Sequence, residues 1–148
     1  EYEDQIKALS ILTVLICLKF FFVILASGGK RKRAPEDGFQ PKAATEAISN
    51  DNNDGNAQPG FSEEERWKRI VQNDMENIPI TLTLMWIAVI CQGNYETNVA
   101  FATIFLFGRV MHTICYIYSL MPWRSLAWFL GILSTLGFMG NIVYGAFQ

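Results

Sequence analysis

Apolar residues are gathered into four long runs, which cover residues 8–29, 78–93, 99–121 and 125–147. A helix needs about 20 mostly apolar residues to cross the ~30 Å hydrocarbon core of a bilayer. Backbone polar groups in lipid must be bonded within the protein, and the alternating pattern of a membrane barrel is absent from this sequence. Each run therefore predicts a membrane-spanning helix.

The second run is short by itself, so we expect its helix to begin earlier, in the polar segment near Ser62. The predicted fold class is an all-α integral membrane protein, a four-transmembrane-helix bundle. We expect a single membrane domain over residues 1–148.

Composition and charge exclude an ordinary soluble domain. Hydrophobic residues make up 51% of the chain and charged residues only 18%, against about 25% in typical soluble domains. After Glu76 the only charged residues are Glu96, Arg109 and Arg124. The net charge of -2 gives no support for a nucleic-acid partner.

The basic residues predict the orientation in the membrane. Positive side chains cluster at residues 30–33 and 66–69, and Arg124 follows the third run, whereas the loop at 94–98 has no Lys or Arg. By the positive-inside rule, the loops at 30–65 and 119–124 face the cytoplasm, and both termini face the opposite side.

The loop at 30–65 is polar, and residues 43–60 within it are rich in Asn, Asp, Ala and Gly. This composition is typical of a flexible loop. Its length leaves open a role as a contact with a larger membrane complex. The three cysteines lie in or beside apolar runs without metal-ligand spacing, so we expect no metal site.

Charged residues inside the spans need partners, because an isolated charge in a bilayer is costly. Lys19 lies in the middle of the first span, and Asp74 is the residue expected to neutralise it as a buried structural pair. Arg109 has no acid on its own span, so it needs an anion from another helix or a ligand. We expect a neighbouring subunit or a ligand to cover the Arg109 face, which favours a homotrimer.

Other polar side chains recur at helical spacing and share faces near the cytoplasmic end. One face carries Arg66, Arg69, Asn73 and Glu76, and another carries Arg109, His112 and Tyr116. Guanidinium groups suit carboxylates, and an Arg beside a hydroxyl can stabilise a thiolate. This inventory predicts a small, anionic and zwitterionic ligand, with a lipophilic co-substrate reaching the site from the bilayer.

Several linked motifs resemble the MAPEG family, the membrane-associated proteins in eicosanoid and glutathione metabolism. The segment from Glu65 to Ile78, ERWKRIVQNDMENI, resembles the family's helix-two signature, and GRVMHTICY, from Gly108 to Tyr116, resembles its helix-three signature. Ala34-Pro35-Glu36-Asp37 is similar to the Pro-Glu-Asp motif of the first cytoplasmic loop. The resemblance is to the branch that holds microsomal glutathione transferase 1 and microsomal prostaglandin E synthase 1.

The resemblance implies a homotrimer that binds glutathione between neighbouring subunits. The residues implied to bind glutathione are Arg31, Arg69, Asn73, Glu76, His112, Tyr116, Arg124 and Ser125. Arg124, with Ser125 or Asp37, would activate the thiol. The long loop after Asp37 is a departure from both relatives.

The resemblance implies a glutathione transferase or peroxidase of the endoplasmic reticulum or mitochondrial membrane, acting on lipophilic electrophiles or lipid hydroperoxides. A prostaglandin-E-synthase-like isomerase and a non-catalytic subunit of a larger complex stay open as alternatives. Two positions bear on the choice. Trp128 stands where the synthase has a tyrosine that contacts glutathione, and Gln72 stands where it has an arginine.

Overall fold

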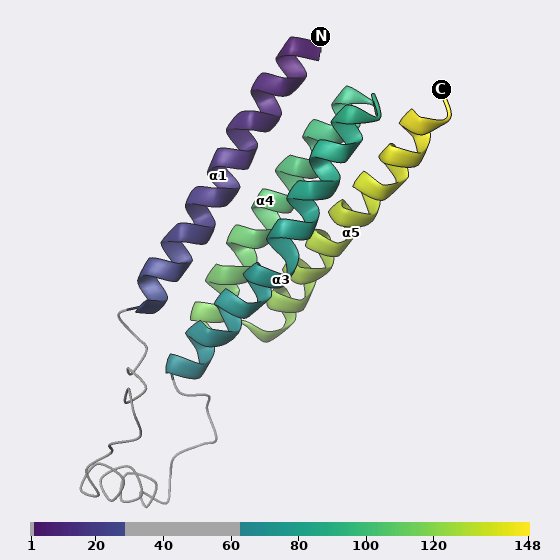
Figure 1. Ribbon diagram of the computed structural model, residues 1–148. Helices are drawn as coiled ribbons and strands as arrows, with labels where there is room; N and C mark the ends of the chain where they lie inside the picture. The colour runs from purple at the N-terminus through teal and green to yellow at the C-terminus, as the bar shows by residue number, and fades with distance from the viewer. Residues whose placement is uncertain (1, 29–62) are drawn as a thin grey trace, which may run out of the picture.

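A computed structural model gives the structure of residues 2–28 and 63–148, and within these ranges the chain forms four helices and no strand. The helices are α1 (Tyr2–Gly28), α3 (Glu63–Ile90), α4 (Tyr95–Ile117) and α5 (Met121–Ala146). They form one elongated bundle in which α3, α4 and α5 alternate in direction (Figure 1). The all-α, four-helix prediction is confirmed.

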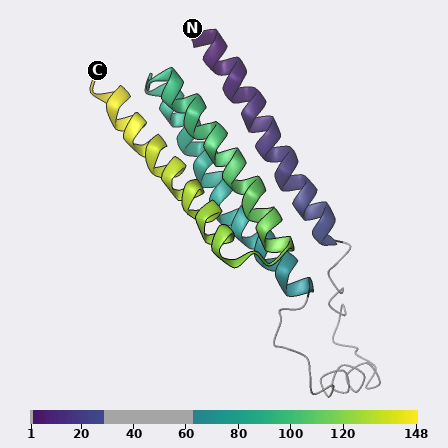
Figure 2. The same ribbon diagram turned by 180° about the vertical axis from the view of Figure 1, so that it is seen from behind.

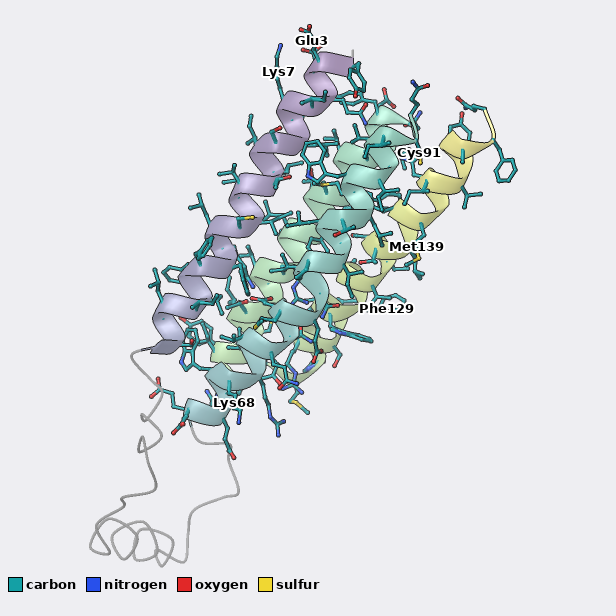
Figure 3. All side chains as sticks on the ribbon, viewed as in Figure 1. Glu3, Lys7, Lys68, Cys91, Phe129 and Met139 are labelled. Atoms are coloured by element: carbon teal, nitrogen blue, oxygen red, sulfur yellow. The ribbon has the colours of Figure 1, made fainter. Side chains whose placement is uncertain are left out.

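The helix ends and turns are arranged in space as the predicted orientation requires. The N-terminus, the C-terminus and the turn between α3 and α4 lie at one end, while the turn between α4 and α5 lies at the other (Figures 1 and 2). Lys68, near the start of α3, lies at the opposite end from Glu3, Lys7 and Cys91 (Figure 3). The end that carries Lys68 and the turn at Tyr118–Leu120 is called the basic end below. That it faces the cytoplasm stays a prediction.

The apolar core is divided into three clusters, and a polar layer interrupts it. Leu9, Met85 and Phe138 belong to the cluster nearest the termini. Ile16, Ile78 and Phe105 form a central cluster, and Val23, Ile70 and Val71 form a third near the basic end. Between the second and third clusters, the order along each helix leaves Lys19, Asp74 and Arg109 at one level.

The outer surface of the bundle is apolar, as lipid contact requires. Phe22, Leu25, Phe107, Phe129 and Met139 are all exposed, and Figure 3 shows Phe129 and Met139 projecting outward from α5. A soluble monomer does not expose apolar surface on this scale. The surface therefore faces lipid or other subunits.

Among the described helices, α1, α4 and α5 are long and apolar enough to cross a membrane, by length and composition. The second predicted span belongs to α3, a helix of 28 residues that begins at Glu63, so the expectation of an early start near Ser62 is confirmed. Its first half is too polar to qualify by composition. The reason is that this half supplies Asn73 and Asp74 to the interior of the bundle.

The turn between α4 and α5 lies earlier in the chain than predicted. The third helix ends at Ile117 and the fourth begins at Met121, each about four residues before the predicted limit. Ser119 has a left-handed φ of 56°, which breaks the helix, and Pro122 fits the first turn of α5, where no helical N–H is needed. At the other end, Asn94 caps α4 by accepting the Thr97 N–H at 3.0 Å.

Candidate functional site

The polar layer is an ion cluster built on one carboxylate. Asp74 Oδ2 accepts from Lys19 Nζ of α1, and Asp74 Oδ1 accepts from Arg109 Nε of α4 at 3.2 Å and from Arg109 Nη2. The side chains of Asp74 and Arg109 are 0% and 1% exposed, and that of Lys19 is 10% exposed. The cluster therefore ties three helices together at a depth that water does not reach freely.

The predicted pairing of Lys19 with Asp74 is confirmed, and so is the need of Arg109 for an anion from another helix. The expectation that a neighbouring subunit or a ligand must cover Arg109 is wrong, because Asp74 already covers it within a single chain. Arg109 therefore gives no argument for a trimer.

Arg109 also connects the ion cluster to Asn73, which borders a cavity. Its Nη2 donates to Asn73 Oδ1 at 2.5 Å, next along α3 from Asp74. Asn73 is half-buried, and its backbone oxygen accepts from Asn77 Nδ2 at 2.7 Å. Asn73 is thus held between the buried cluster and a cavity on the side of the bundle.

That cavity has a volume of about 170 Å³. It lies among α3, α4 and the start of α5, and its lining consists of Asn73, His112, Tyr116, Arg124, Ser125 and Trp128. Five of these six are predicted glutathione-binding residues; Trp128 is the sixth. Residues separated by up to 55 positions are therefore brought to one surface.

The lining is organised around the Tyr116 ring. The Arg124 guanidinium carbon lies 4.6 Å from the centre of this ring, and the His112 ring centre lies 5.3 Å from it. A guanidinium over an aromatic face is held by the ring quadrupole and keeps its charge. Arg124 also donates to Met121 Sδ, one turn earlier on α5, at 3.2 Å.

His112 brings an unused polar atom to this region. The residue is 3% exposed, and its Nδ1 has no hydrogen-bond partner among the described residues. Buried polar atoms nearly always have a partner, so this nitrogen of His112 can form a hydrogen bond with a group that enters the cavity.

The first turns of α3 hold the rim of the cavity in place. Arg66 donates from Nη1 to the backbone oxygen of Ile117, the last residue of α4, at 2.9 Å. This bond satisfies a carbonyl that the helix itself leaves open. It fixes the start of α3 against the end of the helix that carries His112 and Tyr116.

Two predicted site residues in the described part of the chain lie elsewhere. Arg69 and Glu76 are exposed on α3 and do not line the cavity, and Glu76 accepts from Gln72 Nε2 at 3.2 Å. Arg31 and Asp37, like the loop at 43–60, lie outside the described residues. Their roles stay predictions.

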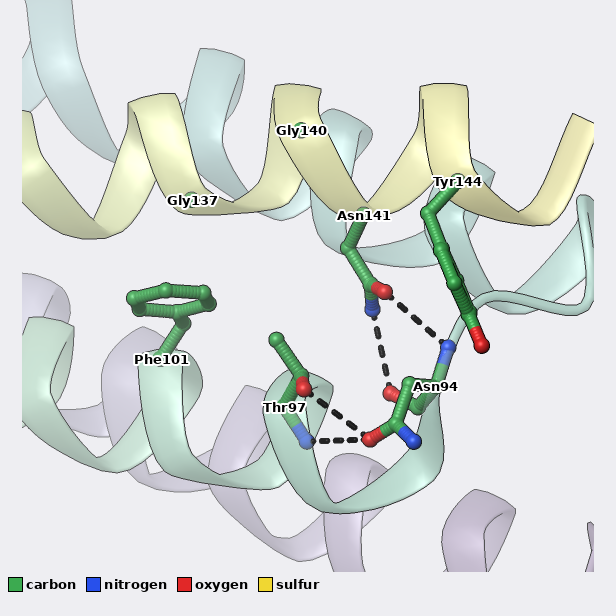
Figure 4. A pocket seen from close by; sticks show the side chains of 7 residues that line it. All are labelled: Asn94, Thr97, Phe101, Gly137, Gly140, Asn141 and Tyr144. Atoms are coloured by element: carbon green, nitrogen blue, oxygen red, sulfur yellow. Dashed lines mark hydrogen bonds between the residues drawn. The ribbon is translucent and has the colours of Figure 1, made fainter.

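A larger cavity, of about 370 Å³, lies between α4 and α5 near the end that carries the termini (Figure 4). Asn141 closes it on one side: its Oδ1 accepts the Asn94 N–H at 3.0 Å, and its Nδ2 donates to the Asn94 carbonyl and to Asn98 Oδ1. Its lining has no charged residue. The smaller cavity, with its arginine and histidine, is the candidate functional site.

The comparison with protein families tests the resemblance seen in the sequence. The model of the MAPEG family matches residues 8–144, almost the whole chain and all four helices. The chain belongs to the MAPEG family. A comparison with curated proteins finds no match.

Membership places this MAPEG protein among integral membrane proteins of glutathione-related transferase and isomerase function. The resemblance seen in the sequence is thereby confirmed at the level of the family. The branch within the family stays a prediction.

Sequence reasoning missed the connection from Arg109 to Asn73. The spacing of Arg109, His112 and Tyr116 predicts that they share one face of the third span. In the structure this face is divided: Arg109 faces the ion cluster, and Tyr116 and His112 face the cavity. One signal was present, because Asn73 directly precedes Asp74, the acid expected in the interior.

Proposed function

We propose that this MAPEG protein is a membrane-bound glutathione transferase or peroxidase. It binds glutathione at the basic end, activates it as a thiolate, and conjugates lipophilic electrophiles or reduces lipid hydroperoxides. The observation that carries the proposal is the position of Arg124, which lies over the Tyr116 ring at a cavity shared with His112, Asn73 and Ser125.

The chemistry of the lining fits glutathione. This tripeptide carries two carboxylates, an ammonium group, two peptide units and a thiol, so it needs cations, donors and hydroxyls together. Arg124 supplies a permanent cation, the orphan Nδ1 of His112 needs a partner, and Tyr116 and Ser125 supply hydroxyls. The exposed Trp128 adds an apolar side, suited to a substrate that arrives from lipid.

Thiol activation follows from the charge of Arg124. A free thiol has a pKa near ~8.5, and a nearby guanidinium lowers this value, so more of the thiol is ionised at neutral pH. The thiolate is the nucleophile; it forms the new sulfur bond to the electrophile while the leaving group departs with its electron pair. In this proposal Ser125 orients the sulfur by a hydrogen bond, and Asp37 is the alternative partner.

The size of the cavity supports a site shared between chains, and the family resemblance makes that assembly a homotrimer. Ligand sites usually enclose about 300–1,000 Å³, whereas the described residues of one chain enclose about 170 Å³. A neighbouring chain would supply the missing wall. In this proposal Arg69 and Glu76, which are exposed on α3 outside the cavity, contribute to binding a ligand held between chains. We propose that this trimer lies in the endoplasmic reticulum or mitochondrial membrane, with its basic end toward the cytoplasm.

The test is the substitution Arg124→Leu in the purified protein, reconstituted in lipid. We expect loss of the ultraviolet absorbance of the bound thiolate and loss of turnover with a model aryl halide, while glutathione still binds. Lys68→Leu is the matched control, because Lys68 is an exposed cation of the basic end that does not line the cavity. Unchanged turnover in Arg124→Leu would remove Arg124 from the mechanism.

Two other outcomes identify the alternatives. A wild-type protein that neither binds glutathione at saturating concentration nor turns over would favour a non-catalytic subunit of a larger complex. Trp128 lines the cavity at the position where a synthase carries a tyrosine. A gain of prostaglandin isomerase activity in Trp128→Tyr would show that the missing hydroxyl is what keeps this chain from being a synthase, whereas isomerase activity of the wild-type protein would favour the isomerase alternative.

A further inference from the structure

Arg109 does not line the cavity, yet it holds one residue that does. It is 1% exposed and bonded to Asp74, and its Nη2 donates to the side chain of Asn73. We propose that Arg109 is a positioning residue, which fixes the Asn73 amide so that its NH₂ group serves the bound ligand. This inference rests on the proposed function. It adds that Asn73 offers the ligand a hydrogen-bond donor and not an acceptor.

The orientation of the amide follows from the chemistry of arginine. A guanidinium group has five N–H donors and no acceptor, so the Asn73 atom that faces it must be the carbonyl oxygen. With Oδ1 held by Arg109, Nδ2 is the donor that Asn73 can offer to the cavity that it lines. Without Arg109, the terminal torsion of asparagine is broad and nearly two-fold, and either end of the amide could face the cavity.

Arg109 can impose this orientation because it cannot itself move easily. Its Nε and Nη2 both donate to Asp74 Oδ1, and Asp74 Oδ2 is occupied by Lys19. These side chains connect α1, α3 and α4 and are surrounded by apolar clusters. A buried polar network in which the partners are satisfied is rigid and specifies one arrangement.

The consequence is a rule for the ligand. The group that meets Asn73 must be an acceptor, such as a peptide carbonyl or a carboxylate oxygen. A donor at the same place, such as an ammonium group, would face an N–H₂ group and lose affinity. Arg109 thus contributes to specificity without contacting the ligand.

The experiment is a double-mutant cycle on the dissociation constant for glutathione, measured by calorimetry on the lipid-reconstituted protein. Arg109→Met is suitable because it leaves Lys19 and Asp74 as a neutral pair. We expect it to weaken binding about fivefold to tenfold when Asn73 is present, the value of about one hydrogen bond. In the Asn73→Ala background, we expect Arg109→Met to change binding by less than about twofold.

Thiolate absorbance at saturating glutathione separates positioning from catalysis. We expect it to be retained in Arg109→Met, because Arg124 is untouched, so KM rises while kcat changes little. Lys19→Met is the matched control: it removes the other cation of the cluster but leaves the bonds from Arg109 to Asp74 and Asn73. We expect near wild-type affinity in that variant.

Asn73→Asp tests the rule independently of any change at Arg109. One oxygen would still meet Arg109, and the other would present an acceptor in place of the N–H₂ group, so we expect weaker binding than in Asn73→Ala. Equal losses from Arg109→Met in both backgrounds, or wild-type affinity in Asn73→Asp, would overturn the inference. If the wild-type protein does not bind glutathione, the proposed function itself is wrong. If Arg109→Met does not fold, the affinity of Asn73→Asp is the measurement that tests the inference.

Discussion

Asp74 and Arg109 form an ion pair that is closed inside a single chain. Arg109 Nε lies 3.2 Å from Asp74 Oδ1, and both side chains are almost fully buried. An unpaired arginine in lipid would be costly, and so would an unpaired buried carboxylate. Each charge is therefore tolerated only because the other neutralises it. The same carboxylate serves Lys19 on a third helix, so the packing of α1, α3 and α4 depends on one acid.

Removal of this acid should cost more than removal of either base. Asp74→Asn leaves two buried cations without a counter-charge, and breaking such a pair costs about 3 to 5 kcal/mol. Lys19→Met leaves a neutral Asp74–Arg109 pair, so we expect a loss of about 1 kcal/mol or less. Thermal unfolding of both variants in the same detergent checks the order, and equal losses would contradict it.

Asn141 should stabilise the end of the bundle that carries the termini without affecting the active site. Its side chain makes hydrogen bonds to the backbone N–H and carbonyl of Asn94 and to Asn98 Oδ1. Asn141→Ala leaves these groups unpaired, and we expect a loss of about 2 to 3 kcal/mol. Affinity for glutathione should be unchanged in calorimetry, and a large change would mean that the two ends of the bundle are coupled.

Two glycines of α5 allow a matched test of how closely the helix packs against its neighbours. A Cβ at Gly145 would lie 2.3 Å from the Cys91 backbone oxygen and 2.7 Å from the Gly93 nitrogen, whereas a Cβ at Gly140 has nothing within 4 Å. We expect Gly145→Ala to cost about 1 to 3 kcal/mol. Gly140→Ala should be neutral or slightly stabilising, because alanine favours the helix by up to about 1 kcal/mol. Melting temperatures of the two variants measure the difference.

The aromatic ring under Arg124 should matter more than the hydroxyl that it carries. Tyr116→Phe keeps the ring 4.6 Å from the guanidinium carbon, and Tyr116→Leu removes it. We expect Tyr116→Leu to lower glutathione affinity about threefold to fivefold more than Tyr116→Phe does, as an arginine that loses a cation–π contact of about 1 kcal/mol is less well placed. Titration of the thiolate absorbance measures both. The reverse order would assign the role to the hydroxyl.

The orientation can be tested by thiol labelling in sealed vesicles. The three native cysteines, Cys17, Cys91 and Cys115, are first replaced by serine or alanine. Glu96 and Tyr118 are exposed near opposite ends of α4, so Glu96→Cys and Tyr118→Cys report the two sides. We expect a membrane-impermeant reagent to label Tyr118→Cys from the cytoplasmic side and Glu96→Cys from the other. Labelling of both from one side would contradict a spanning α4.

The sequence by itself determined the class of the protein and part of its interior. Four apolar runs separated by polar turns require spanning helices, because the hydrophobic pattern is a local property of the chain. The pairing of Lys19 with Asp74 was also predictable, since a buried cation in lipid needs an acid and few were present. The family motifs in α3 and α4 predicted three residues that line the cavity, Asn73, His112 and Tyr116, and the resemblance also implied Arg124 and Ser125 of α5.

Only the tertiary structure decided which group neutralises Arg109 and which residue of the cavity Arg109 holds. Which base reaches which oxygen of Asp74 depends on the register and rotation of three helices, and no pattern along one helix contains that information. The same register turns Arg109 away from His112 and Tyr116 and toward Asn73. The sequence named the polar residues, but the packing of the helices assigned each one a partner, because hydrogen bonds depend on distances across the bundle.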